Sequence, residues 1–542
     1  IAGLPSASIG SNGWVVAPTR TRSGRALFAF DSHDSFAMPN LFHELHLFYG
    51  DGRQLRGWSI AGLPGVVNGF NECLAWGLTN IGDSQDLFIE TRDPDDTTRF
   101  KGRSGWYQAT VEHVTIPVRG SDAQTVRIVL TENGRLISDD PPLALRWSAL
   151  ELGELGIDAL LDMNVATSWD QFDAALDGLA APSTQVTYAD VSGRIASRTV
   201  GVLPQRGKGT GLVPLRGEDP DSAWIGLLPT SALPRSIDPA VGFIAAANAR
   251  LTPSEGFPLV SDDNAPGYRM RRITQVLGDN DALDVDDMRA LQVDWFNTQA
   301  SLLLGPLTDG IDRSRLTPQA VDALVLLERW ASQPINARDS AAATIYERWY
   351  ITLADALFEP TLGAVLLNRL KRNGYVLNHA LDWLILSAPT NSWWRNDRSG
   401  IITDSFQRAV DELQRTLDAP MAAWHWELLH TLEFRHELSG AVPLLGRLLD
   451  RGPFPWGGGN PTVGRARYDY DRPFAARAGA TVRVVIEMSN PMRAYAIMPG
   501  GQSGHFLSAH YDDQIPAWLA GELVPLAATP EDVGTVATKL VP

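Results

Sequence analysis

A serine that directly precedes an apolar run is the first feature of this sequence that could carry out chemistry. Residues 10–14 read Gly-Ser-Asn-Gly-Trp, and the run WVVAP that starts at Trp14 is typical of a β-strand. The residues before Ser11, IAGLPSASIG, are small and uncharged, like a spacer. A cut between Gly10 and Ser11 would give Ser11 a free α-amino group beside its hydroxyl. Because such an amine has a pKa of about 8, it could be the base that activates its own hydroxyl.

Three familiar catalytic patterns are not found in the sequence. Residues 43–46, His-Glu-Leu-His, have the wrong spacing for two zinc ligands one helical turn apart. Residues 501–505 approach the Gly-x-Ser-x-Gly elbow but end in histidine. Gly207-Lys208-Gly209 lacks the spacing of a phosphate-binding loop. The motifs of a zincin, an α/β-hydrolase or a P-loop enzyme are therefore not indicated.

Composition excludes further classes. The chain has 542 residues, 44% of them hydrophobic and 20% charged, which is enough to bury the cores of two or three domains. Its formal net charge of −17 argues against a nucleic-acid partner, because such a protein needs a basic face. The single cysteine, Cys73, cannot form an intramolecular disulfide. We find no apolar run of 18 residues and therefore expect no membrane span.

Periodicity predicts an α+β protein with a helical insertion. Residues 12–130 carry short strand-like runs, 148–180 show helical spacing, and 185–201 read as a hairpin. Residues 265–450 are rich in Leu, Ala, Arg, Glu and Trp at helical spacing, and TVRVVIEMS at 481–489 predicts another strand. The expected division is a spacer remnant at 1–10, a first core part at 11–264, a mainly helical insertion at 265–455, and a second core part with a C-terminal tail at 456–542.

Six segments in one order resemble the penicillin acylase family of N-terminal-nucleophile hydrolases. They are GSNGW at 10–14, FDSHDS at 30–35, LPGVVNGFNECLAWGLTN at 63–80, YADVSGRI with GVLPQRGKGTG at 188–211, AAANAR with GYRMRRI at 245–273, and GGQSGHFLSAHYDDQIPAWLAGE at 500–522. The resemblance covers nearly all of residues 10–525 and is to the large catalytic subunit. It implies a four-layered αββα sandwich.

The resemblance also implies roles for individual residues. Ser11, freed by autocatalytic cleavage after Gly10, would attack an amide carbonyl, and an acyl-enzyme would form. Asn80 would offer its backbone N–H and Asn248 its side-chain N–H to the oxyanion. Arg269 would hold the Asn248 amide, and His33 would hydrogen-bond around the serine and its amine. The expected substrates are acylated small molecules: β-lactams, acyl-homoserine lactones or acylated peptides.

A structural calcium site is implied in the same way. Asp83 and Asp86 with the carbonyl of Gln85 match the family's metal loop, and Asp263, or its neighbour Asp262, would be a further ligand. No organic cofactor is expected. Relatives are made as one precursor, so we expect a small α subunit from the same precursor and, by family precedent, export to the periplasm or outside the cell.

Asp34 departs from the family pattern, in which an aromatic or aliphatic residue usually lines the acyl pocket. If its carboxylate faces the pocket, a purely apolar acyl group would desolvate it at a cost, which favours a polar or amine-bearing acyl group. The alternative is that Asp34 turns away into a hydrogen bond or ion pair.

Other interpretations stay open at this level. Asn80 could be a turn residue, Asn248 a satisfied buried amide, Arg269 a surface residue, His33 a core residue, and the aspartates a solvated turn. The whole protein could be a catalytically silent homologue or an unprocessed precursor that binds an acylated ligand. A helical scaffold protein would explain only residues 265–450.

Overall fold

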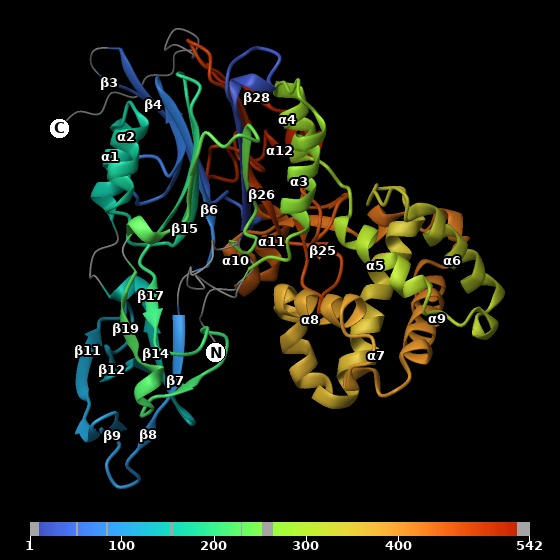
Figure 1. Ribbon diagram of the computed structural model, residues 1–542, viewed down its shortest axis with the longest axis horizontal. Coiled ribbons are helices and arrows are strands. Elements are labelled where there is room, and N and C mark those ends of the chain that lie inside the picture. Colours follow the sequence, from blue (N-terminus) through green and yellow to red (C-terminus); the bar gives the residue numbers. More distant parts are fainter. Residues whose placement is uncertain are drawn as a thin grey trace.

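The computed structural model describes residues 10–49, 52–82, 85–151, 156–228, 230–251 and 264–527 (Figure 1). Of the expected site residues, Asp83, Asp262 and Asp263 lie outside these ranges, as do residues 1–9 of the expected spacer.

The first sheet contains the strand that carries Ser11. Its strands are β1 (Gly10–Val16), β2 (Leu27–Ser35), β21 (Phe243–Ala246), β24 (Ala466–Arg467), β26 (Ala478–Glu487), β27 (Arg493–Ile497) and β28 (Val524–Pro525). They run in the order β21-β1-β2-β26-β27-β28, and β24 pairs with β26. β1 is an internal strand and is buried along its whole length. This explains why its second half, Trp14, Val15 and Val16, is apolar on both faces.

The second sheet stacks on the first. Its strands are β3 (Phe42–Tyr49), β4 (Arg53–Ile60), β5 (Asn68–Asn71), β6 (Leu74–Asn80), β15 (Thr184–Asp190), β16 (Ile195–Val200) and β20 (Arg235–Ile237), in the order β20-β16-β15-β6-β5-β4-β3. Between the sheets, Val15 and Phe30 of the first pack in one apolar cluster with Trp58 and Ala189 of the second. This cluster is the centre of the sandwich.

Helices cover both outer faces (Figure 1). On the second sheet, α1 (Ile157–Val165) and α2 (Trp169–Leu176) pack against Trp76 and Tyr188. On the first, α3 (Tyr268–Asp279), α4 (Val285–Gln292) and α12 (Ile515–Leu519) pack against Trp14. The layer order is therefore helix, sheet, sheet, helix, as the sequence resemblance implied.

A second β unit extends from one end of the sandwich (Figure 1). It contains β7 (Gln85–Ile89), β8 (Thr91–Arg92), β9 (Arg99–Gly102), β10 (Gly105–Gln108), β11 (Thr110–Ile116), β12 (Gln124–Thr131), β13 (Gly134–Asp139), β14 (Pro142–Trp147), β17 (Pro204–Arg206), β18 (Leu215–Arg216) and β19 (Trp224–Leu227). Here β7 continues the chain directly from β6, so this unit starts a few residues beyond Asn80.

A helical body lies on the other side of the sandwich (Figure 1). It contains α5 (Thr298–Thr308), α6 (Pro318–Trp330), α7 (Ala341–Arg372), α8 (Gly374–Leu386) and α9 (Arg398–Leu417), which enclose one apolar core. The shorter elements β22 (Thr431–Phe434), α10 (Glu437–Ala441), α11 (Pro443–Leu449), β23 (Arg451–Pro455) and β25 (Ala475–Ala476) lead back to the sheet.

One helix of the described chain, α7, is long and apolar enough to cross a membrane by length and composition. The sequence had indicated no such segment. Trp349, Tyr350 and Leu353 of α7 are buried in the apolar core of the helical body, so this part of α7 packs as a core helix. α7 is also kinked at Gly363, whose φ is 70°.

Several element boundaries differ from the sequence expectation. Helical structure was expected from 148, but Ser148–Leu150 is a 3-10 turn and the first α-helix starts at Ile157. The hairpin at 185–201 is confirmed as β15 and β16, and the strand at 481–489 as β26, which starts at Ala478. α3 and α4, which were assigned to the insertion, cover the first sheet. The apolar face of a helix does not tell which surface will cover it.

Candidate active site

Ser11 lies near the start of β1 and is 4% exposed. Val15 packs between the two sheets, whereas Trp14 and Val16 pack against the outer helices. Because side chains alternate along a strand, Ser11 faces the second sheet with Val15. Its hydroxyl oxygen is thus on the side of the sheet where β6 and Asn80 lie.

Asn248 binds the main-chain nitrogen of Ser11. It follows β21 in the left-handed conformation, with φ 57°, which asparagine adopts more readily than most residues. Its Oδ1 accepts hydrogen bonds from Ser11 N–H at 2.8 Å and from Arg269 Nη2 at 2.7 Å. Two donors on one oxygen fix the orientation of the amide. The Asn248 Nδ2 group therefore points the other way and donates to the Asn80 carbonyl at 2.6 Å.

Asn80 ends β6 with its backbone facing Asn248. Leu78 N–H donates to Asn68 Oδ1 at 2.8 Å on the β5 edge of the strand, and Ile81 N–H donates to Ser183 O at 3.4 Å on the other edge. Alternate residues of a strand direct their N–H groups to the same edge, so the N–H of Asn80 faces the β5 edge, as its carbonyl does. The N–H of Asn80 and the Nδ2 of Asn248 are two donors on one side of Ser11.

Arg269, in the first turn of α3, donates hydrogen bonds to both Ser11 and Asn248. Its Nη1 donates to the Ser11 carbonyl at 2.8 Å and to Asn12 Oδ1, while Nη2 holds Asn248. The side chain is 3% exposed, and burial, reinforced by the nearby Arg465, lowers the pKa of Arg269 to about 10. The guanidinium stays charged at neutral pH and fixes three acceptors with one rigid fork.

His33 lies on the opposite face of the sheet from the Ser11 hydroxyl. It pairs across β1 and β2 with Gly10, and its Nε2 contacts Asp31 Oδ2 and, at 3.3 Å, Asn12 Nδ2. Burial, followed by the charges of nearby arginines, holds the pKa of His33 well below its usual range, so the ring is neutral. Its connection to Ser11 runs through Asn12 and not through a direct hydrogen bond of the described residues.

Asp34 shares the Ser11 face. Its Oδ2 accepts hydrogen bonds from Ser32 Oγ and, at 2.9 Å, from Thr481 Oγ1. Ser32 is the residue paired with Ser11 across the two strands. Burial raises the pKa of Asp34 above its usual value. One carboxylate oxygen is thus anchored in hydrogen bonds, while the side chain stays on the Ser11 face and does not turn away from it.

The described part of the expected calcium loop does not fit a calcium ion as it stands. Asp86 is 1% exposed, and its carboxylate accepts from Arg206 Nε at 2.9 and 3.1 Å and from Trp224 Nε1. A cation would have to displace this guanidinium. Within the described residues, no group of three His, Cys, Asp or Glu side chains is arranged to hold a metal. Because Asp83 and Asp263 lie outside the described ranges, the structure does not test the expected calcium site, and no chemical step is derived from it.

Three further residues near Ser11 were not expected from the sequence. Asn12, Asp31 and Arg465 surround the main chain of Gly10 and Ser11 on the face opposite the hydroxyl. Asp31 could have been found, because it alternates with His33 along β2 and so shares its face. Arg465 lies 454 residues beyond Ser11, and no local pattern distinguishes it.

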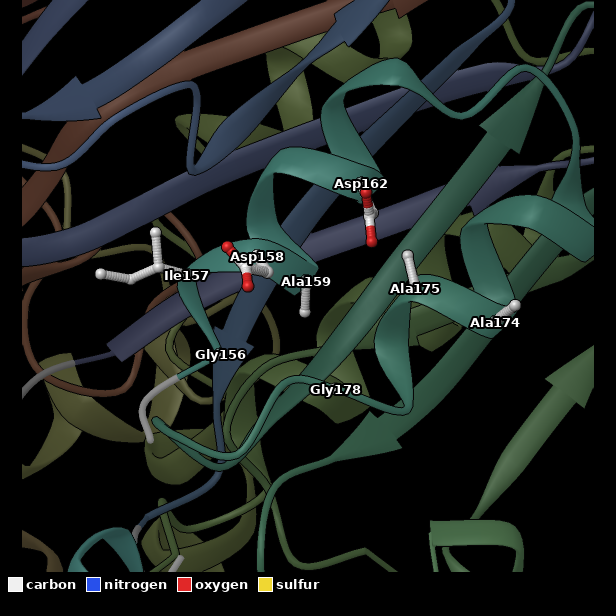
Figure 2. Close-up of a pocket in the computed structure, with 8 residues that line it drawn as sticks. All are labelled: Gly156, Ile157, Asp158, Ala159, Asp162, Ala174, Ala175 and Gly178. Atoms are coloured by element: carbon white, nitrogen blue, oxygen red, sulfur yellow. The ribbon is translucent and has the colours of Figure 1, made fainter. Parts of the chain in front are cut away.

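A surface groove elsewhere has different chemistry. It lies between α1 and α2, and Figure 2 shows Asp158 and Asp162 of α1 across from Ala174 and Ala175 of α2. These helices cover the outer face of the second sheet, away from Ser11. The residues that line it include two carboxylates but no hydroxyl, thiol or imidazole, so we assign it no catalytic role.

Comparisons with known proteins identify the family of this chain. A profile of the penicillin amidase family matches residues 2–535. The acyl-homoserine lactone acylase QuiP of Pseudomonas aeruginosa is 28% identical over 97% of this chain and 67% of its own length. The penicillin acylase 2 proenzyme of a Pseudomonas species is 28% identical over 95% of this chain and 67% of its own length. The chain therefore spans about two thirds of the length of these curated relatives.

A solved structure shows the same fold. The thermostable penicillin G acylase from Alcaligenes faecalis superposes with a TM-score of 0.75 at 18% identity, over 98% of this chain and 99% of that one. With the profile match over nearly the whole sequence, the chain belongs to the penicillin amidase family, a family of amide hydrolases.

Proposed function

We propose that this protein is an acylase that removes an acyl side chain from a small molecule through an acyl-enzyme on Ser11. The observation that carries the proposal is the single hydrogen-bonded network that joins Ser11 to Asn80, Asn248 and Arg269. In it a buried hydroxyl faces the same side as two directed N–H donors. A lone serine or a lone satisfied amide would not require this arrangement.

The first step is release of the nucleophile. In the uncut chain the nitrogen of Ser11 is part of the peptide bond to Gly10 and has no basic lone pair. Hydrolysis of that bond by the protein itself would leave a carboxylate on Gly10 and an amine on Ser11. The relative named a proenzyme supports such processing.

The freed residue would then supply both nucleophile and base. The α-amine takes the proton of the Ser11 hydroxyl as Oγ attacks the amide carbonyl, and the oxygen of that carbonyl becomes an oxyanion. Asn80 N–H and Asn248 Nδ2 stabilise this charge, which develops only in the transition state. The amine returns the proton to the leaving nitrogen, the C–N bond breaks, and water then hydrolyses the ester on Ser11 to release the acid.

The substrate class follows from the relatives and from Asp34. Acylated β-lactams, acyl-homoserine lactones and acylated peptides are the candidates, in line with the names of the relatives. Because both hydrogen bonds to Asp34 go to Oδ2, we propose that Oδ1 selects a polar or amine-bearing acyl group. Substituting Asp34→Phe and comparing amine-bearing with neutral acyl amides tests this, and an unchanged preference would refute it.

We also propose the remaining family features. These are a small α subunit from the same precursor, which would account for the greater length of the relatives, and a periplasmic or secreted location.

The experiment compares two serines that face each other across β1 and β2. Protein made from the whole gene is assayed against a panel of acyl amides as wild type, Ser11→Ala and Ser32→Ala. We expect Ser11→Ala to abolish turnover and acyl-enzyme formation, as detected by intact mass, whereas Ser32→Ala keeps both. Binding of an acylated ligand without turnover in the wild type would instead support a silent homologue or an unprocessed precursor.

A further inference from the structure

Arg465 is a buried cation beside the candidate nucleophile that the mechanism above does not use. It directly precedes β24 and is 4% exposed, yet its Nε and Nη1 atoms have no hydrogen-bond partner within the described part of the chain. Its guanidinium lies over the ring of Tyr375, at 5.4 Å from the centroid. A buried charge with unsatisfied donors is costly, so its retention calls for an explanation.

The distance of Arg465 from the nitrogen of Ser11 can be derived from its approach to Gly10. A Cβ atom added to Gly10 would lie 2.5 Å from Arg465 Nη1 and 3.5 Å from Arg269 Nη2. Standard backbone dimensions then place Arg465 Nη1 within about 6 Å of the nitrogen of Ser11. Two guanidinium groups therefore flank the atom that becomes the α-amine when Gly10 is removed.

We propose that Arg465, together with Arg269, keeps the freed α-amino group of Ser11 in its neutral, basic form at neutral pH. This inference rests on the proposed function, in which that amine is the general base. A positive charge a few ångströms away disfavours protonation of an amine, and the effect is large where water is excluded. An amine kept free of its proton is ready to accept the proton of the hydroxyl.

The other charged groups around Ser11 leave this positive field largely uncompensated. The titratable and charged side chains near Ser11 on the packed elements are Asp31, His33 and Asp34 from β2, Arg269 from α3, Tyr375 from α8, Arg465 before β24, Arg467 in β24 and Arg483 from β26. Arg467 is paired with Asp469, and Asp34 lies on the other face.

Asp31 is the one carboxyl group of the described residues on this face of β1 and β2. It is already bonded to Asn12 and His33, and burial raises its pKa to about 8. Even when ionised, one carboxylate faces the three buried guanidinium groups of Arg269, Arg465 and Arg483. The neutral state of His33 on the same face has the same origin, since burial and these arginines together oppose a further positive charge.

The test titrates the nucleophile without a substrate. Self-cleaved protein made from the whole gene is treated with phenylmethylsulfonyl fluoride at a series of pH values, and the rate of Ser11 sulfonylation is followed by intact mass. We expect an apparent pKa below the range of about 7.7 to 8.0 that is usual for α-amines. Arg465→Gln should raise it by about one unit or more, because one flanking charge is removed. Arg465→Lys keeps a charge and should raise it less.

A matched control separates charge from general damage. Arg467→Gln removes a guanidinium two residues away that already has a carboxylate partner, and it should leave the apparent pKa unchanged. A purely structural role of Arg465 would lower the amount of folded protein but not move the pH profile of what folds.

The outcomes distinguish this inference from the proposed function. Equal apparent pKa values in the wild type and Arg465→Gln overturn the role of Arg465 while leaving the acylase intact. If Arg465→Gln does not self-cleave, the test rests on the apparent pKa of Ser11 labelling in the wild type. A wild-type value of about 8 or higher contradicts the proposal. A wild-type protein that never frees Ser11, or whose Ser11 is not labelled, overturns the proposed function and this inference together.

Discussion

Removal of the Asn248 amide is the perturbation whose effect can be worked out in most detail. This side chain accepts from Ser11 and Arg269 and directs its Nδ2 group beside the Asn80 backbone. Losing one oxyanion donor typically lowers kcat by ~10²–10³-fold, or about 3–4 kcal/mol of transition-state stabilisation. Arg269 keeps its bonds to Ser11 O and Asn12 Oδ1, so we expect the fold to survive.

Two substitutions separate the amide from the backbone. Asn248 has φ 57°, and an alanine there would add about 1–2 kcal/mol of left-handed strain, whereas glycine adopts this conformation without it. Asn248→Ala and Asn248→Gly both lose the amide. We therefore expect similar losses of kcat in both, and a lower thermal stability in Asn248→Ala than in Asn248→Gly.

The assay normalises turnover to the amount of competent nucleophile. Freed Ser11 is titrated with phenylmethylsulfonyl fluoride and counted by intact mass, and kcat is then measured on an amide that the wild type hydrolyses. A slow-maturing variant is thereby not mistaken for a slow enzyme. If Asn248→Gly retains kcat within about threefold of the wild type per freed Ser11, the oxyanion role of Asn248 is refuted.

Three other predictions concern self-cleavage, acid stability and metal dependence. Gly10→Ala should slow self-cleavage about tenfold or more in a mass-spectrometric time course, because the new Cβ would lie 2.5 Å from Arg465 Nη1. His430 is fully buried, and burial lowers its pKa from 6.5 to about 4. Its contribution to the free energy of unfolding is therefore fully present above pH 6.5, and up to about 3 kcal/mol of it is lost as the pH falls toward 4. Denaturation curves between these pH values should show that slope, and His430→Gln should flatten it. Chelation with EDTA should leave Tm unchanged, because Arg206 already neutralises Asp86.

Each of these has a contrary result. Normal cleavage of Gly10→Ala would show that Arg465 yields easily. The matched control is Gly267→Ala, since a Cβ there meets no atom within 4 Å. An unaltered acid slope in His430→Gln would assign the slope to other groups. A fall in Tm on chelation that calcium reverses would show that the ion displaces Arg206 or binds through other residues.

The residues of the candidate site were predicted from the sequence largely through resemblance. Ser11, Asn80, Asn248 and Arg269 are far apart in the chain, and no spacing rule links them. The structure brings Ser11 and Asn248 together because β1 pairs with β21, and Asn248 lies two residues after the end of β21. The Asn248 side chain then contacts Asn80 and Arg269. Their catalytic roles stay predictions until the experiments above are done.

The surrounding charges could not be predicted from the sequence. Arg465 meets Gly10 only because three strand pairings act together: β24 pairs with β26, β26 pairs with β2, and β2 pairs with β1. The partner of Asp34, Thr481, is 447 residues away. Such contacts depend on tertiary pairing, on which local periodicity carries no information. The hydrogen-bonded environment of Asp34 was open at the sequence level for that reason.

The layered fold was predicted, but the boundaries between the sandwich, the second β unit and the helical body were not. Apolar alternation identified the β15–β16 hairpin and most of β26, where one or both faces are buried. The separate β unit from β7 to β14 was not distinguished from the sandwich, because its exposed strands alternate in the same way. α3 and α4 were grouped with the insertion, since an amphipathic pattern does not identify the surface on which a helix packs.

The central claim is that cleavage after Gly10 frees Ser11 as the nucleophile. Intact mass together with N-terminal sequencing, on protein purified from expression of the whole gene, tests it most directly. The account predicts an N-terminus that reads Ser-Asn-Gly-Trp in the form that hydrolyses amides, with the segment IAGLPSASIG removed. A chain that still carries this segment joined to Ser11 and yet hydrolyses amides would contradict it.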